Sequence, residues 1–244
     1  MCRNNMTKYK GKSTLEVLEG ANNYNQWIAD LVRKKIHSPV LEIGAGTGNI
    51  SRYFTNVKSL TITDIDPALI NGLKKRFTNT NAFSYTVLDI AKQTPKKFLG
   101  HFSSVFAVNV LEHIRDDEKA LKNLNSVLKK HGSLVLLVPA KQYAYTRLDK
   151  ELGHFRRYEK NMLREKLEQA GFIVEDIFYF NLIGLLSWMV RDKIERNNFY
   201  LKPYQIAIFD SIVPILKACE AIVRPPVGIS LIVYARKQQS VYLS

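Results

Sequence analysis

The sequence predicts a three-layer α/β fold with a seven-stranded, mostly parallel sheet and a helical insertion between the last two strands. Two observations carry this prediction. Short apolar segments alternate with longer segments in which apolar residues recur at helical spacing, which is typical of a doubly wound sheet. Two further apolar segments follow the alternation, and the stretch between them is too long for a simple turn. The 244 residues suffice for one domain of this kind.

The first half of the chain predicts three strands, at Val40–Ile43, Leu60–Ile65 and Phe83–Leu88. A helix over 21–36 precedes them, because its apolar residues recur at helical spacing and Pro39 follows. A second helix is expected after the glycine-rich turn at 44–48. Asp66-Pro67 predicts the start of a third helix, with Asp66 as its cap and Pro67 in its first position.

The second half predicts four more strands, at Val105–Val110, Ser133–Val138, Phe172–Phe180 and Ile229–Ala235. The first of these is apolar on both faces, as expected of a central parallel strand. A long helix over about 116–130 is expected to end at Gly132, and another over 159–170 is expected to end at Gly171. Right-handed crossovers would bring the carboxyl ends of the early strands to one edge, where ligands bind in such folds.

The segment 181–227, between the last two predicted strands, predicts a helical cap. It contains the apolar run Leu182–Val190 and an amphipathic segment with apolar residues on one side, namely Phe209, Ile212, Val213, Leu216 and Val223. Ile177–Val190 falls short of the roughly 20 residues that span a bilayer, so a buried strand running into a cap helix is favoured. A helix lying on a membrane surface is the alternative, supported by the following Arg191, Lys193 and Arg196.

The chain is strongly basic, with 36 Lys and Arg against 22 Asp and Glu and a net charge of +14. This charge suggests an anionic partner, either a nucleic acid, a phosphorylated substrate or an anionic membrane surface. A general excess of lysine spread over the surface is the alternative. Residues 1–20 are polar and basic and predict an N-terminal arm, and 21–244 predict a single domain.

The cysteines indicate a reducing compartment. Cys2 and Cys219 lie at opposite ends of the sequence and form no CxxC pair and no metal-ligand spacing, so we expect no metal. The N-terminus lacks an apolar core of signal-peptide length. We therefore expect a cytoplasmic protein, with attachment to the periphery of a membrane as the alternative.

Acidic residues at three predicted strand ends point to a nucleoside-containing ligand. The turn Gly44-x-Gly46-x-Gly48 differs from the G-x-G-x-x-G of dinucleotide enzymes, and Glu42 just before it suits a cationic ligand end rather than a phosphate. Asp64 ends the second strand about 20 residues on, where an acid can accept hydrogen bonds from ribose hydroxyls. Asp89 follows the third strand and can meet an adenine amino group. Capping of loops and helices is the alternative role for each aspartate.

Several segments resemble class I methyltransferases. The sequence LEIGAGTG at 41–48 resembles their first motif, TDIDPALI at 63–70 the next, and VLDI at 87–90 the adenine-binding segment. NVLEHI at 109–114 and the segment 121–139 resemble the fourth and fifth strand regions of the small-molecule branch of that class. The resemblance spans about 35–180 and implies a Rossmann-like fold with S-adenosylmethionine as the cofactor.

The motifs and the resemblance together give the predicted cofactor-binding residues. In that branch the first-motif backbone faces the methionine part of the cofactor, the segment around Asn109 lies near the reactive methyl, and an N-terminal helix covers the cofactor. The predicted contacts are Tyr24, Glu42, Gly44, Ala45, Gly46, Asp64, Ile65, Asp89, Ile90 and Asn109.

The candidate catalytic residues follow the fourth and fifth strands. An imidazole group ordinarily titrates near neutrality, so His113 and His154 could take a proton from an acceptor, and Tyr158 is a further candidate in the same segment as His154. Arg156 and Arg157 could hold an anionic acceptor. The alternative is structural, in which His113 packs against the next helix while His154 and the arginines fix a loop.

The favoured function is methyl transfer to a small-molecule or lipid-linked acceptor. An RNA or DNA methyltransferase is the first alternative, although Asn109-Val110-Leu111-Glu112 stands where base-amine enzymes often carry an Asn/Asp-Pro-Pro-aromatic motif. A non-catalytic scaffold that binds S-adenosylmethionine is the second. A nicotinamide dehydrogenase is disfavoured by the glycine spacing.

Overall fold

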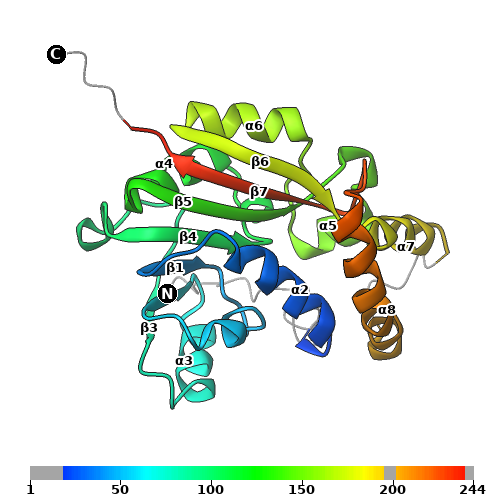
Figure 1. The fold of residues 1–244 in the computed structure, drawn as a ribbon, viewed down its shortest axis with the longest axis horizontal. Helices are drawn as coiled ribbons and strands as arrows, with labels where there is room; N and C mark the ends of the chain where they lie inside the picture. Colours follow the sequence, from blue (N-terminus) through cyan, green and yellow to red (C-terminus); the bar gives the residue numbers. More distant parts are fainter. Residues whose placement is uncertain (1–18, 195–201, 240–244) are drawn as a thin grey trace, which may run out of the picture.

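The computed structural model describes residues 19–194 and 202–239 and has the predicted three-layer α/β architecture (Figure 1). Seven strands form one sheet in the order β3-β2-β1-β4-β5-β7-β6. β7 runs antiparallel to both of its neighbours, β5 and β6, and the other pairings are parallel. This topology confirms the mostly parallel Rossmann-like sheet with a helical segment between its last two strands.

The strands of the sheet are β1 (Val40–Ile43), β2 (Leu60–Asp64), β3 (Phe83–Val87), β4 (Phe102–Val108), β5 (Leu128–Pro139), β6 (Phe172–Phe180) and β7 (Ser230–Lys237). The α-helices are α2 (Asn22–Arg33), α3 (Pro67–Arg76), α4 (Asp117–Val127), α5 (Arg147–Leu152), α6 (Lys160–Gln169), α7 (Leu182–Ile194) and α8 (Pro203–Ile222). Short 3-10 turns are η1 (Ser51–Phe54), η2 (Lys96–Phe98), η3 (Leu111–His113) and η4 (Gln142–Ala144).

Two apolar cores cover the two faces of the sheet. Leu41 and Ile43 of β1 pack with α4 and α6 on one face, whereas Val40 packs with α2 and η1 on the other. Because side chains alternate along a strand, Glu42 points to the same face as Val40 and reaches Ser51 of η1. The alternation therefore places one carboxyl group of β1 inside the core beneath the glycine-rich turn.

Two predicted helix boundaries are confirmed by their local geometry. Asp66 caps α3 by accepting a hydrogen bond from the backbone N–H of Ala68, and Pro67 occupies the first helical position. Gly171 follows α6 with a φ of 83°, in the left-handed region that ends helices. Both signals depend on neighbours in sequence, which is why they could be predicted.

Two other helix predictions were wrong. The segment after Gly48 forms only the 3-10 turn η1, and α4 ends at Val127 rather than near Gly132. The Nζ atom of Lys237 donates hydrogen bonds to the carbonyls of Asn125 and Leu128. A side chain from β7 therefore caps the C-terminus of α4. Leu128 is buried and already belongs to β5. This capping group comes from the far end of the chain, so the local sequence did not reveal it.

Helices α7 and α8 lie together at one end of the molecule, beside α2 (Figure 1). Asn181 turns the chain from β6 into α7 with a φ of 62°, and its Oδ1 accepts a hydrogen bond from the backbone N–H of Gly184. Asp210 of α8 accepts hydrogen bonds from the backbone N–H groups of Asn23 and Tyr24 at the start of α2. The predicted cap is therefore anchored to the helix expected to cover the cofactor.

Residues of α8 do not all face as predicted. Phe209, Val213 and Leu216 pack against the core, but Ile212 is partly exposed and Val223 is exposed. Among the described residues, no helix is both long and apolar enough to cross a membrane. The basic arm predicted for 1–20, apart from its last two residues, and Arg196 lie outside the described residues.

Candidate functional site

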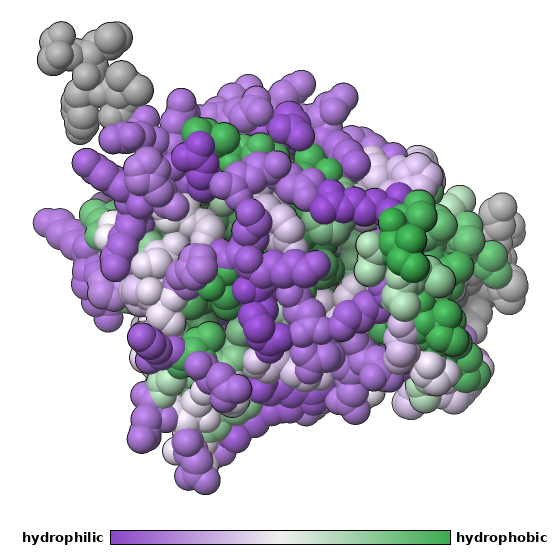
Figure 2. Space-filling model, viewed as in Figure 1, coloured by the Kyte–Doolittle hydropathy of each residue, from purple (hydrophilic) through white to green (hydrophobic). Residues whose placement is uncertain are grey.

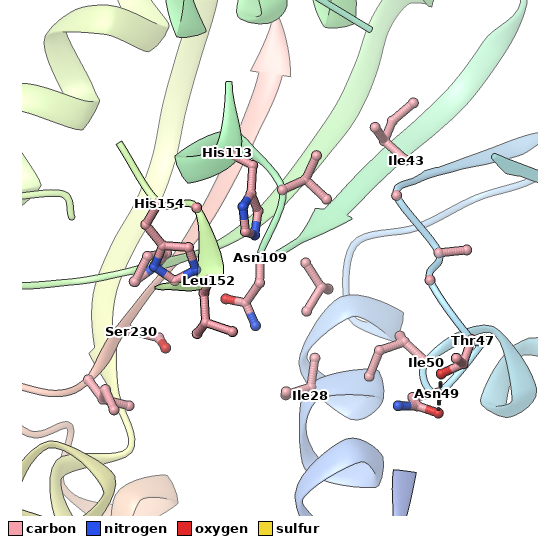
Figure 3. Close-up of a pocket in the computed structure, with 18 of the residues that line it drawn as sticks. Ile28, Ile43, Thr47, Asn49, Ile50, Asn109, His113, Leu152, His154 and Ser230 are labelled. Atoms are coloured by element: carbon pink, nitrogen blue, oxygen red, sulfur yellow. Dashed lines mark hydrogen bonds between the residues drawn. The ribbon is translucent and has the colours of Figure 1, made fainter. Parts of the chain in front are cut away.

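A cavity of roughly 2240 Å³ opens at the carboxyl edge of β1 to β4, and Figure 3 shows part of its lining. The ends of these strands form its floor, α2 forms one wall, and the segment 148–157 forms the opposite wall. Residues of α7 and α8 complete it, including Trp188, Phe209 and Ile212. All ten predicted cofactor-binding residues line this cavity.

The glycine-rich turn has a backbone that glycine alone tolerates well. Gly44 and Gly46 have φ values of 68° and 57°, in the left-handed region. A Cβ atom on Gly44 would lie 2.5 Å from Cγ2 of Val110, so the turn packs directly against the segment after β4. This packing leaves the turn's backbone on the cavity wall, where a ligand can approach it.

Asp64 is held rigidly at the end of β2. Its Oδ2 accepts a hydrogen bond from the backbone N–H of Gly46 at 2.8 Å, and its Oδ1 accepts one from Asp66 at 2.9 Å. Burial raises the pKa of this carboxyl, and the backbone hydrogen bonds act in the opposite direction. A fixed carboxylate with remaining lone pairs suits the two hydroxyls of a ribose.

Glu42 lies beneath the turn and is 3% exposed. Its Oε2 accepts a hydrogen bond from the Ser51 hydroxyl at 2.6 Å. Burial raises the pKa of Glu42 from 4.5 to about 8, and the nearby charge of Asp64 adds to the increase. A cationic ligand group would reverse this shift, because an opposite charge favours the ionised carboxylate.

Asp89 and Asn109 end the next two strand regions. Oδ1 of Asp89 accepts a hydrogen bond from the backbone N–H of Ala91, and buried Ile90 lies beside it on the cavity wall. Asn109 has a φ of 53°, and its side chain points into the cavity (Figure 3). Side chains that accept or donate hydrogen bonds thus lie at the ends of four adjacent strands, which fits the ribose, adenine and amino-acid ends of S-adenosylmethionine.

Tyr24 closes the α2 side of the cavity. Its ring stacks on Phe180 with centroids 5.8 Å apart and meets Phe209 edge-on at 5.6 Å. Burial raises its pKa to about 12 despite side-chain hydrogen bonds with Asn181 and Ser230. The ring therefore links α2, β6 and α8 where these elements meet the predicted cofactor site.

Two histidines on the cavity wall are in contact with each other. The ring centroids of His113 and His154 are 4.7 Å apart and the rings are nearly perpendicular, close to Asn109 (Figure 3). Nδ1 of His154 lies 2.7 Å from Oδ1 of Asp149. Burial lowers the pKa of His113 from 6.5 to about 4, and His154 acts in the same direction. His113 is therefore a neutral imidazole at pH 7.

Arg157 lines the cavity, but its charge is already paired. Its Nε and Nη2 donate to the two oxygens of Asp149 at 2.9 and 3.0 Å, and its Nη1 donates to the carbonyl of Ala140. Burial would raise the pKa of Asp149, but the bonds from His154 and Arg157 outweigh it and lower the pKa. The guanidinium lies 4.9 Å from the Trp188 ring. This geometry does not support Arg157 as the group that holds an anionic acceptor.

Arg156 and Tyr158 point away from the cavity. Arg156 forms an ion pair with Asp117 at 2.6 Å. Tyr158 is fully buried, and its hydroxyl donates to Oδ2 of the same aspartate at 2.9 Å. Burial and Asp117 raise the pKa of Tyr158, so its proton is held tightly. Arg157 thus faces the cavity, whereas its neighbours Arg156 and Tyr158 both reach Asp117. The structure thus separates both residues from the site predicted for them.

Two buried acids near the histidines were missed from the sequence. Glu112 is fully buried, and neither of its oxygens has a hydrogen-bond partner among the described residues. Burial raises its pKa to about 8. Asp149 forms a capping box with Thr146, which is a local sequence pattern. Its contacts with His154 and Arg157 depend on how the chain folds beyond that helix. The available signal for Glu112 was its place between the apolar residues Val110 and Leu111 and the candidate His113, just after the fourth predicted strand.

Comparisons with known proteins agree with this geometry. A family model described as a methyltransferase domain matches residues 19–177. The non-reducing polyketide synthase ausA of Penicillium brasilianum is 33% identical over 124 residues, covering 46% of this chain and 5% of the synthase. The chain thus spans about a twentieth of the length of the first curated relatives it matches.

Two solved structures share the fold. The CMeT domain of the citrinin polyketide synthase has a TM-score of 0.57 and 16% identity, over 84% of this chain and 47% of that one. The trans-methyltransferase CalH, in complex with SAH, has a TM-score of 0.56 and 20% identity, over 90% of this chain and 57% of that one. At these identities the likeness concerns the fold alone.

Proposed function

Because the chain belongs to the methyltransferase domain family, and is therefore an S-adenosylmethionine-dependent methyltransferase, we propose that its acceptor is a small, largely apolar molecule, either free or lipid-linked. One observation carries the proposal. A single cavity joins the carboxylates at the ends of β1 to β3 to a second region lined by His113, His154 and apolar residues of α7 and α8. A cofactor in the first region would present its methyl group to an acceptor in the second.

The polar groups of the acceptor region lie close together. Asn109, His113 and His154 lie near one another on the cavity wall (Figure 3). The apolar residues Trp188, Phe209 and Ile212 also line the cavity. A bound S-adenosylmethionine supplies an activated methyl group, so the protein must mainly align the acceptor atom and exclude water. An apolar acceptor body with one nucleophilic group matches this arrangement.

The outer surface of α7 and α8 favours the lipid-linked form of the acceptor. Hydrophobic side chains gather over these helices, at the right of Figure 2. Ile208, Ile215 and Ile222 are spaced by seven residues and are each at least 63% exposed, so they form a stripe along one side of α8. A helix that is apolar on its buried side and also on its exposed side suits a lipid surface. The net charge of +14 favours an anionic surface.

The proposal is tested by methyl transfer to fractionated cell extract. The full chain is incubated with S-adenosylmethionine carrying a labelled methyl group, and the products are separated into organic-soluble, nucleic-acid and protein fractions. We expect label in the organic-soluble fraction, and none with a Gly44→Val variant, whose side chain would displace Val110 and fill the cofactor turn. Label confined to RNA or DNA would contradict the small-acceptor proposal.

A further inference from the structure

We propose that Glu112, His113 and His154 bind a divalent transition-metal ion at the acceptor end of the cavity. The inference rests on the proposed function, since the ion would serve the acceptor of that reaction. The ligand atoms of the three residues all lie within 4.8 Å of one another, although they come from η3 and from the loop after α5. An ion that bonds each atom at about 2.0–2.2 Å would draw them to within about 3–4 Å. Small side-chain movements achieve this.

The Glu112 carboxyl provides independent support for a ligand. It is fully buried, yet neither oxygen accepts or donates a hydrogen bond within the described part of the chain. A buried carboxyl group without partners is costly, and buried charges are normally paired or bound to metals. The positive charge of Arg157 lowers the pKa of Glu112, but the hydrogen bonds of Arg157 go elsewhere, from Nε and Nη2 to Asp149 and from Nη1 to Ala140. A metal ion is a partner that satisfies this carboxylate.

Both imidazoles are oriented as metal ligands commonly are. Nδ1 of His154 lies 2.7 Å from the Asp149 carboxylate, which Arg157 fixes in turn. The His113 ring is hydrogen-bonded to the backbone of Gly153. Metal-binding histidines usually donate one ring N–H to a carboxylate or a carbonyl, which orients the other ring nitrogen toward the ion. The segment 149–157, which begins in α5, therefore supplies the supporting contacts of both histidines.

Two histidines and one carboxylate define the class of ion. This ligand set is used by non-haem Fe²⁺ sites and by catalytic Zn²⁺ sites, and it leaves coordination positions open for water or substrate. Both histidines line the cavity, so the open positions face the space assigned to the acceptor. Such an ion would bind an acceptor oxygen and lower the pKa of its hydroxyl. The proposal therefore specifies an acceptor with an alcohol, phenol or enol oxygen.

The reaction balances without an oxidant or a reductant. The acceptor O–H bond breaks and its proton passes to solvent, while the oxygen forms a bond to the methyl carbon. The sulfur–methyl bond breaks at the same time, its electron pair stays on sulfur, and the demethylated product leaves. In this scheme the three side chains hold the ion, and Asn109 lies at the edge of the same space (Figure 3).

The test measures metal binding and cofactor binding separately. Tag-free full chain is stripped with a chelator and titrated by calorimetry with Zn²⁺ or Mn²⁺ alone, and binding of the demethylated cofactor is measured in parallel. We expect one ion per chain, with affinity reduced at least about 10-fold in Glu112→Gln and in His154→Gln. His101→Gln, remote from the cavity, is the matched control and should bind the ion as the wild type does.

The outcomes separate this inference from the proposed function. If the wild type binds no ion, or if both variants bind it unchanged, the metal site is wrong, even when labelled methyl transfer to the organic fraction persists. If the ion binds but no organic-soluble product is labelled with metal present, the proposed acceptor class fails instead. Should Glu112→Gln fail to fold, as judged by circular dichroism, His154→Gln alone decides the metal site, because that side chain is not fully buried.

Discussion

Buried carboxyl groups give the candidate site its chemical character at the scale of single residues. Glu42 and Asp64 lie at adjacent strand ends, and both have pKa values raised by burial. Each is also held by a hydrogen bond, from Ser51 and from the backbone of Gly46 respectively. In the free protein these two carboxyl groups are therefore available to bind a ligand that carries a positive charge or hydroxyl groups.

Glu42 should make cofactor binding depend on pH. Its pKa is about 8 in the free protein, so it is mostly protonated at pH 7, and a cationic amino group nearby would favour its ionised form. Binding should then release up to about one proton, and the affinity should rise with pH until about 8 and level off above it. Calorimetry in buffers of different ionisation enthalpy measures this release. Glu42→Gln should abolish it, and an unchanged release in that variant would place the titrating group elsewhere.

Asp64 should contribute directly to cofactor affinity. In Asp64→Asn the side chain keeps its size but loses its charge and part of its capacity to accept hydrogen bonds. We expect binding of the demethylated cofactor to weaken by about 1–3 kcal/mol, measured by calorimetry. Glu118→Gln is a control on the exposed surface, where the carboxylate pairs with Lys166. Equal affinities for wild type and Asp64→Asn would remove Asp64 from the ribose site.

The sequence allowed the location of residues at strand ends to be predicted. All ten predicted cofactor-binding residues line the cavity, and all but Tyr24 lie at or just after the ends of β1 to β4, because parallel strands bring their carboxyl ends to one edge. Their contacts with the cofactor stay predictions. It predicted residues less well within the segment 156–158, where Arg157 lines the cavity but Arg156 and Tyr158 do not. Tyr158 turns to Asp117, a residue distant in sequence, and no local pattern shows this contact.

At the scale of elements, α8 is joined both to the core and to α2. Its buried side packs on the core through Phe209 and Val213, and Asp210 joins it to the first turn of α2. Lys217 of α8 also pairs with Asp30 of α2. These contacts link the helix above the predicted cofactor site to the helix above the acceptor region.

Removing the Asp210 carboxylate should loosen α2 and α8 together. Asp210 accepts hydrogen bonds from two backbone N–H groups at the start of α2, so it acts as a cap supplied by another helix. We expect Asp210→Ala to lower the free energy of unfolding by about 0.5–2 kcal/mol and to speed hydrogen exchange in both helices. Ser211→Ala, next to it on the exposed side, is the matched control. Faster exchange confined to α8 would show that the cap does not couple the helices.

Elements were predictable where their end signals were local. The caps at Asp66 and Gly171 were predicted correctly, and each predicted strand exists, although β4 and β5 begin earlier than predicted, at Phe102 and Leu128. The end of α4 was not predicted correctly, because Lys237 from β7 binds its last carbonyls. The short helix α5 was overlooked although Thr146, Asp149 and Gly153 supply its end signals. Hydrophobic periodicity cannot reveal a helix of six residues.

At the scale of the whole molecule, the chain combines an exposed apolar stripe with a positive net charge. The apolar stripe of α8 borders the cavity through Ile208, and the chain carries a net charge of +14. An apolar face combined with basic residues is typical of proteins that bind the surface of anionic membranes. This arrangement would place the cavity opening near the lipid.

Membrane binding should depend on the stripe and on salt. We expect the wild type to float with vesicles that contain anionic lipids, and to bind less at high ionic strength because salt screens the attraction. The double variant Ile215→Gln and Ile222→Gln should bind more weakly. Leu99→Gln is the matched control, since Leu99 is an exposed apolar residue outside the cavity lining and outside α7 and α8. Equal flotation of the two variants would remove α8 from the lipid contact.

The order of the strands in the sheet also affects how the chain takes shape during translation. β7 follows α8 in the sequence but lies between β5 and β6 in the sheet. When the ribosome has synthesised the chain only as far as α8, β1 to β5 can already pair, whereas β6 still lacks its neighbour. The nucleotide half of the enzyme can therefore assemble first. The part that contains β6, α7 and α8 joins the sheet only when β7, Ser230–Lys237, inserts between β5 and β6, which were synthesised before it.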